Sequence, residues 1–324
     1  MKTRILIVAG ATATGKSDAA AALAVRLGGE VISADSMQIY KKMDIGTAKP
    51  TAAEMRGVPH HLIDELPPDE PYSAAIFQDM ARARAADIAA RGKLPIVCGG
   101  TGFYINALLY GTDFTETVTD EKLRAELAAY AEVNGADALH TRLRGIDPDA
   151  ADAIHAHNVR RVIRALEYHA QTGQRISAHN TAQRARTADY DADMFILTRG
   201  RAELYERIDA RVDTMLARGL LDEVRGLLDA GYARSLPSMQ GLGYKEIIRY
   251  INGVYTWEEA VRVLKRDTRH FAKRQCTWFA HQADGAAVTI RADAGAEAAA
   301  EEVLRHLARR VNDSKACDRR ERYD

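Results

Sequence analysis

The feature that most constrains this chain is a phosphate-loop motif near its N-terminus. Residues 10–17 read GATATGKS, a complete match to G-x-x-x-x-G-K-[ST]. The apolar run at 4–9 predicts a buried strand before the loop, and the Ala- and Leu-rich run at 16–27 predicts a helix after it. These flanks argue against a simple glycine turn, so we expect backbone amides that surround phosphate oxygens, with Lys16 adding positive charge and Ser17 binding Mg²⁺. The predicted phosphate-binding residues are Gly10, Ala11, Thr12, Ala13, Thr14, Gly15, Lys16 and Ser17.

Buried strands alternate with helical patterns along most of the chain. Apolar runs at 30–34, 94–98, 194–198 and 286–290 predict further strands, and the amphipathic pattern at 72–91 predicts a long helix. Alternation of this kind is typical of an α/β fold whose ligands bind at the carboxyl ends of parallel strands. We therefore expect a P-loop NTPase-like parallel sheet core.

A region without strand patterns interrupts this alternation. Between about residues 115 and 188, helical patterns dominate at 121–133, 136–143 and 157–171. A last helical pattern at 295–310 precedes a charged tail. The predicted domains are a catalytic core at 1–114 and 189–312, an inserted all-helical domain at 115–188, and a flexible tail at 313–324.

Composition excludes some classes of protein. Lys plus Arg and Asp plus Glu both total 45, so any RNA contact must come from local clusters of positive charge. Cys98, Cys276 and Cys317 fit neither a disulfide framework nor a zinc site, which favours a reducing cytoplasm. The N-terminal apolar run is shorter than a signal peptide requires, and no run reaches the roughly 18 apolar residues of a membrane span. We expect a cytoplasmic protein with no membrane contact.

The motifs that the chain lacks narrow the chemistry. A motor ATPase needs an apolar strand that ends in an acid, whereas the run at 94–98 ends in two glycines. The segment most similar to such a strand is LIDE at 62–65, whose acids we interpret as solvated residues at a strand end. The chain also has no Asn-Lys-x-Asp motif of guanine-specific proteins. Small P-loop kinases and transferases remain.

Asp35 is the first candidate for a catalytic base. It follows the second predicted strand, and an acid at that strand end faces the phosphate loop. Asp35 could take a proton from an acceptor while Lys16 and Mg²⁺ stabilise the departing phosphate. A turn-forming or helix-capping Asp explains the position equally well.

Six motifs together resemble the tRNA dimethylallyltransferase family, in its bacterial form. They are GATATGKS, ADSMQIYKKMDIGTAKP, GGTGFYINALL, HNVRRVIRALE, GLGYKEI and AKRQCTWF, and they extend to about residue 280. The resemblance implies that dimethylallyl diphosphate is the donor and that N6 of adenine 37, in the anticodon loop of tRNA, is the acceptor. It also implies that Asp35 is the base and that Thr101, otherwise a helix-capping threonine, is a second hydroxyl near the reacting groups.

Two basic clusters are candidates for RNA binding. The first is on the insertion, at 160–164, and the second is the set Arg262, Lys265, Arg266, Arg269 and Lys273, whose offsets place it along one helix face. Solvated helix faces without a ligand would have the same pattern. The residues for which the resemblance implies tRNA contact are Asp35, Ser36, Met37, Gln38, Thr101, Arg124, Arg160, Arg161, Arg164, Gln240, Gly243, Tyr244, Lys245, Arg269, Lys273, Arg274 and Gln275.

Two other functions are consistent with parts of the sequence. A small-molecule or nucleotide kinase would bind ATP in the loop and use Asp35 to activate a hydroxyl. A non-catalytic RNA-binding protein would need the basic helices but not Asp35. The resemblance favours the prenyl transfer, and we expect a monomer, because one tRNA could be held between the core and the insertion.

Overall fold

The chain forms two compact units. The computed structural model describes residues 2–114, 120–282 and 287–320. One unit, the core unit, consists of Met1–Leu109 and Asp189–Asp324, and the other, the helical unit, is Tyr110–Ala188. The predicted division into a catalytic core, a helical insertion and a flexible tail stays a prediction.

A six-stranded parallel sheet is the centre of the core unit. Its strand order is β3-β2-β4-β1-β5-β6, and every pair of neighbours is parallel. The apolar runs form these strands because both faces of the sheet are buried. The expected P-loop-like α/β core is confirmed. The strands are β1 Arg4–Gly10, β2 Gly29–Ser33, β3 His60–His61, β4 Leu94–Gly99, β5 Asp191–Thr198 and β6 Ala287–Arg291.

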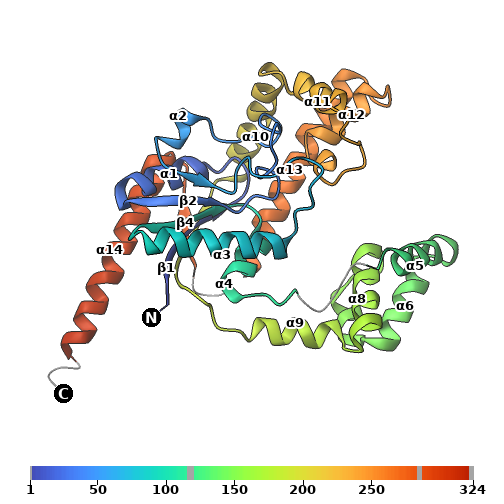
Figure 1. Ribbon diagram of the computed structural model, residues 1–324, viewed down its shortest axis with the longest axis horizontal. Coiled ribbons are helices and arrows are strands. Elements are labelled where there is room, and N and C mark those ends of the chain that lie inside the picture. The colour runs from blue at the N-terminus through green and yellow to red at the C-terminus, as the bar shows by residue number, and fades with distance from the viewer. Residues whose placement is uncertain (1, 115–119, 283–286, 321–324) are drawn as a thin grey trace. The chain divides into compact units, whose positions relative to one another are not determined.

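Helices cover both faces of this sheet. Alternate side chains of β1 point to opposite faces, so Leu6 packs with α1 and α14, while Ile7 packs with α3, α4 and the helices after β5. Figure 1 shows α1 and α3 on either side of the strands. The helices of the core unit are α1 Lys16–Leu27, α2 Ala52–Met55, α3 Ala74–Ala90, α4 Gly102–Tyr110, α10 Arg201–Ala217, α11 Leu220–Asp229, α12 Tyr244–Ile251, α13 Trp257–Gln282 and α14 Ala296–Arg320, with a short 3₁₀ helix at Ser238–Gln240.

The helical unit has its own core. Leu139, Leu143, Val162 and Leu166 pack together, because apolar residues recur at helical spacing on facing helices. Its helices are α5 Glu121–Asn134, α6 Ala136–Ile146, α7 Pro148–Ala153, α8 Val159–Thr172 and α9 Ile176–Arg184.

The ends of some elements differ from expectation. The two-residue strand β3 was not predicted, since two half-buried histidines carry no strand pattern. The predicted helix at 295–310 is longer in the structure, where α14 continues to Arg320. The first residue of the predicted strand at 286–290 lies outside the described residues, as do 115–119 of the insertion. Among the helices described, none has the length and apolarity to cross a bilayer.

A buried acid holds one end of the sheet together. Glu30 on β2 is 2% exposed and accepts hydrogen bonds from Arg91 and from Lys93, at 2.7 Å, while His61 Nε2 lies 2.8 Å from it. The Arg91 hydrogen bonds hold the pKa of Glu30 well below its ordinary value of 4.5, against the opposing effect of burial. Because folding lowers this pKa, the cluster stabilises the fold above about pH 4.5 and loses its effect as the pH falls.

We predict that Glu30→Gln lowers the free energy of unfolding at pH 7 by about 2–3 kcal/mol, because charged partners lose a buried counterion. The variant should also lose less stability than the wild type between pH 6 and pH 3. Urea unfolding at several pH values tests both effects. Asp87→Asn, which removes a mostly exposed carboxylate from the same Arg91, is the control. Parallel pH profiles for Glu30→Gln and the wild type would contradict this account.

Candidate functional site

The phosphate loop joins the end of β1 to the start of α1. A Cβ on Gly10 would lie 2.6 Å from the carbonyl oxygen of Leu197 on β5, so only glycine fits where the strand turns into the loop. Gly15 then caps α1 in a left-handed conformation, at φ 91°. The first N–H groups of a helix have no partner within it, and the helix dipole adds partial positive charge there. The loop is therefore built to bind an anion.

Side chains from distant segments hold the carbonyls of this loop. Arg199 donates to the carbonyl of Thr14 and Arg207 to that of Ala13, both at 3.0 Å. Arg211 Nη1 lies 3.4 Å from Thr12 Oγ1. Arginines from distant segments thus fix the carbonyls of Ala13 and Thr14. Three cations around one loop also raise its affinity for anions.

Gln275 on α13 holds the loop from another side. Its Oε1 accepts from the backbone N–H of Thr12, and its Nε2 donates to the carbonyl of Gly100, both at 2.9 Å. The side chain is 8% exposed. Gln275 was predicted to contact tRNA; its buried side chain instead joins the phosphate loop to the turn before α4.

Lys16 and Arg211 concentrate positive charge beside the loop. Burial lowers the pKa of Lys16, and Arg211 lowers it further, while Cys98 and Asp35 act in the opposite direction. Burial also lowers the pKa of Arg211, against the effect of Asp35. A desolvated cation interacts more strongly with an anion than an exposed one does, because the local dielectric is low.

Asp35 has one of the two roles that the sequence left open, because it forms a turn. Its Oδ1 accepts from the backbone N–H of Met37 at 2.8 Å and, at 3.4 Å, from that of Gln38, which makes it a turn-forming Asp. Its Oδ2 has no hydrogen-bond partner among the described residues. The turn fixes the carboxylate and leaves one oxygen for a ligand.

Two cavities of the core unit meet at the phosphate loop. The larger, about 490 Å³, is called the Asp35 cavity here; it is lined by Asp35, Thr47, Thr101 and Arg211. The other, about 410 Å³, is called the Arg207 cavity; it is lined by Lys16, Ser17, Arg207, Arg211 and Arg218. A small cavity of about 70 Å³ has both Lys16 and Asp35 in its wall. The residues of the loop thus lie between two spaces large enough for separate ligands.

Some predicted RNA-contacting residues line this site and others do not. Tyr244 is fully buried, so its side chain is not available to RNA, and Gln240 is exposed but donates to the carbonyl of Arg234. Gln38 lines only the small cavity. The sequence pattern does not show that Tyr244 is on the buried side of its short helix. The residues that do line the Asp35 cavity are Asp35, Ser36, Met37, Thr101, Gly243, Lys245 and Arg274.

The predicted basic face of α13 is partly neutralised. Lys265 Nζ lies 2.6 Å from Asp213, and Arg269 Nη1 lies 2.6 Å from Asp209. Both acids come from α10, so the offsets along α13 could not reveal them. Arg266 pairs with Asp267 next to it, whereas Lys273 and Arg274 are exposed. Several of the cations on this face of α13 are therefore paired with acids, so they do not form a continuous row of unpaired charges for phosphates.

The arginines of the helical unit that were predicted to bind RNA are of two kinds. Arg124 and Arg164 both donate to Glu167, which is fully buried, at 2.9–3.0 Å. Arg160 and Arg161 are exposed and have no ion-pair partner among the described residues. The first pair stabilises this unit, and the second pair is available to a phosphate backbone.

Sequence reasoning missed the arginines that surround the loop. Arg207 and Arg211 are one helical turn apart on α10, which begins just after a strand that adjoins β1. That spacing was the available signal, because helices after parallel strands start at the edge of the sheet where ligands bind.

Comparison with known proteins agrees with this geometry. The model of the IPP transferase family matches residues 38–282, and that of the isopentenyl transferase family matches residues 3–70. The chain belongs to the IPP transferase family. The tRNA dimethylallyltransferase of Alkaliphilus oremlandii is 50% identical over 86% of this chain and 89% of its own. That of Pelotomaculum thermopropionicum is 48% identical over 94% and 96%.

Solved structures of this family share the fold. The full-length tRNA isopentenylpyrophosphate transferase of Bacillus halodurans is 42% identical, with a TM-score of 0.73 over 98% of this chain and 100% of its own. A eukaryotic dimethylallyltransferase acting on tRNA is 30% identical, with a TM-score of 0.76 over 89% of this chain and 74% of its own. The expected family is thereby confirmed, and this member is a prenyltransferase.

In this family member we predict that Gln275→Leu weakens the site and the fold together. The change leaves the N–H of Thr12 and the carbonyl of Gly100 unpaired, at a cost of about 1–3 kcal/mol each. Urea unfolding measures the stability, and calorimetric titration with inorganic diphosphate measures anion affinity. Cys276→Ser, on the exposed neighbour, is the control. Unchanged diphosphate affinity would show that Gln275 does not shape the loop.

Proposed function

We propose that this enzyme transfers a dimethylallyl group from dimethylallyl diphosphate to N6 of adenine 37 in the anticodon loop of tRNA, and releases diphosphate. Family membership makes it a prenyltransferase that modifies tRNA. The observation that carries the proposal is that Asp35 and the phosphate loop share one cavity wall, with Lys16 and Arg211 beside them. That tRNA is the acceptor is supported by relatives that are tRNA dimethylallyltransferases, one of them solved as acting on tRNA.

The diphosphate end of the donor suits the phosphate loop. Negative charge accumulates on the leaving group as the allylic carbon loses its bond to oxygen. Lys16 and Arg211 border the small cavity beside the loop, where fixed positive charge would stabilise that developing negative charge. We place the donor's entry on the side of the Arg207 cavity, whose wall contains three arginines.

Asp35 suits the acceptor. The exocyclic amine of adenine is a weak nucleophile because its lone pair is delocalised into the ring. A carboxylate oxygen that accepts its proton as the new C–N bond forms would favour attack. Oδ2 of Asp35 is the oxygen left over from the turn, and Thr101 lines the same cavity with its hydroxyl.

Mg²⁺ fits this site through Ser17. No cluster of three acidic, His or Cys residues exists among the residues described, so a cage made of protein ligands alone is not the arrangement. Mg²⁺ is commonly held instead by one or two protein oxygens and the substrate's phosphates, and the exposed Ser17 hydroxyl borders the small cavity beside Lys16. When bound there, Mg²⁺ would neutralise charge on the diphosphate.

The RNA contacts divide between the two units. Lys245 and Arg274 line the Asp35 cavity, and Arg160 and Arg161 on α8 have no ion-pair partner in the part of the chain that the structure describes. An adenine must leave its stack to reach a cavity, which costs a few kcal/mol, so contacts to the phosphate backbone must compensate. One chain supplies both sets of contacts, and we propose that it acts as a monomer.

Label transfer tests this function. The protein is incubated with unmodified tRNA and with either prenyl-labelled dimethylallyl diphosphate or γ-labelled ATP, and tRNA with guanine at position 37 is the acceptor control. We predict label in tRNA only from the prenyl donor and only with adenine 37. Asp35→Asn should lower turnover by about 10²–10⁴-fold, because the base is lost, with tRNA affinity little changed. Label from ATP would favour a kinase, and near-normal turnover of Asp35→Asn would remove Asp35 from the mechanism.

We predict that Arg161→Ala weakens tRNA binding and lowers the slope of log affinity against log salt by about 0.7–1, because one phosphate contact is lost. A salt titration of tRNA affinity measures both effects. Arg144→Ala is the control, because that arginine of the helical unit already pairs with Asp152. Equal slopes for Arg161→Ala and the wild type would count against α8 as an RNA-binding surface.

A further inference from the structure

The loop between β2 and α2 borders the site although it has no regular structure. Gly46 and Thr47 of this loop line the Asp35 cavity, and Thr47 also lines the small cavity beside Lys16. The loop therefore forms part of the wall of the cavities that Asp35 and Lys16 also line. We call residues 43–49 the Thr47 loop and ask what keeps it in place.

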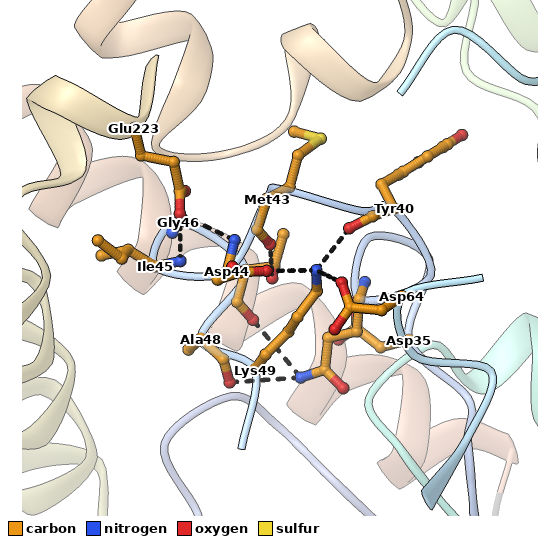
Figure 2. Close-up of polar contacts among 12 residues, drawn as sticks. Asp35, Tyr40, Met43, Asp44, Ile45, Gly46, Ala48, Lys49, Asp64 and Glu223 are labelled. Carbon is orange, nitrogen blue, oxygen red and sulfur yellow. Dashed lines mark hydrogen bonds and ion pairs between the residues drawn. The ribbon is translucent and has the colours of Figure 1, made fainter. Parts of the chain in front are cut away.

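One carboxylate binds the backbone of the Thr47 loop. Glu223 on α11 accepts hydrogen bonds from three consecutive N–H groups, those of Asp44 at 2.9 Å, Ile45 at 2.7 Å and Gly46 at 3.0 Å. Figure 2 shows the Glu223 side chain pointing at this stretch of backbone. Charge-assisted hydrogen bonds of this kind are about twice as strong as neutral ones. They connect segments nearly 180 residues apart in sequence.

Tyr244 completes this contact from α12. Its hydroxyl donates to Oε1 of Glu223 at 2.7 Å. A Cβ on Gly46 would lie 2.6 Å from the Tyr244 ring, so the loop backbone rests directly on the ring and needs glycine there. The buried side chain of Tyr244 therefore supports the Thr47 loop through Glu223 and Gly46.

The other side of the loop is held by Lys49. Lys49 is 7% exposed, and its ammonium donates to Asp44, Asp64 and the carbonyl of Tyr40. Asp44 joins the two anchors, since its N–H binds Glu223 and its carboxylate binds Lys49. Asp64, which we interpreted as a solvated acid at a strand end, is half exposed but has this defined partner.

The Thr47 loop also contacts the turn of Asp35. Gln38 Nε2 lies 3.5 Å from the carbonyl of Thr47 and 3.4 Å from that of Ala48. The N–H of the same Gln38 faces Oδ1 of Asp35 at 3.4 Å. Displacement of the loop would therefore move both a wall of the cavity and the turn that fixes the carboxylate.

We propose that Glu223 is a positioning residue for prenyl transfer, which acts through the Thr47 loop and Gln38 on Asp35 without touching either substrate. The inference rests on the proposed function. Only a carboxylate can accept from all four donors at once. The amide of glutamine would direct an N–H donor at one or more backbone N–H groups, so Glu223→Gln removes part of the contact at nearly constant volume.

The test compares Glu223→Gln with Asp222→Asn. Both changes remove one negative charge from α11, but the Asp222 side chain is 82% exposed and lies 3.7 Å from Arg225. kcat and KM for both substrates are measured well below the melting temperature of each variant. We expect Glu223→Gln to lower kcat on the order of 10–100-fold, because a small misplacement of reacting groups is costly, with the KM for the donor little changed. Tyr244→Phe, which removes one of the four donors and keeps the ring, should fall between this variant and the wild type.

Two results would overturn the inference. One is a kcat of Glu223→Gln equal to that of Asp222→Asn; the other is a loss of activity that a lower fraction of folded protein fully explains. Hydrogen exchange at 43–49 separates this failure from that of the proposed function. An inactive wild type whose loop exchanges faster in Glu223→Gln contradicts the function and supports the role of Glu223 in holding the loop. Unchanged exchange contradicts that role.

Discussion

The whole site depends on the orientation of one short stretch of backbone, residues 10–17. A peptide group that points its N–H at a ligand must point its carbonyl elsewhere, and a buried carbonyl without a partner is costly. Here Arg199 and Arg207 donate to two such carbonyls, and Gln275 accepts from the N–H of Thr12. These partners come from the turn after β5, from α10 and from α13. The phosphate loop is local in sequence, but its conformation is a property of the folded core unit.

The sequence was sufficient for five of the six strands and for the motif, because these depend on short-range patterns. Runs such as 4–9 and 94–98 are apolar throughout, which is how strands buried on both faces read. Partners far apart in sequence could not be predicted. Asp209 and Asp213 neutralise part of α13 from another helix, and Glu167 occupies Arg124 and Arg164. Counting charges along one helix says nothing about the helix that packs against it.

Tyr244 and Gln275 show the same limit at the site itself. Both belong to motifs by which the chain resembles its family, and a motif alone does not say whether a residue touches a substrate or shapes the residues that do. Their burial decides between these uses: Tyr244 supports Gly46 and Glu223, and Gln275 supports Thr12 and Gly100. Both act on backbone, as Glu223 does. The backbone beside these cavities is in loops without regular hydrogen bonding, so side chains from other elements hold it in place.

Ion pairs within the fold likewise decide which cations remain available to a ligand. A chain with no net charge can still bind a polyanion if its acids are engaged within the fold and some of its cations are not. Lys265 and Arg269 are already neutralised by acids of α10, so they add little to the field that a distant phosphate senses. Arg160 and Arg161 have no such partner among the described residues, and Arg211 stands at the cavity with its charge partly desolvated. The cations available to a ligand are thus fewer than the sequence suggests, and a ligand held by so few should be sensitive to the loss of any one of them.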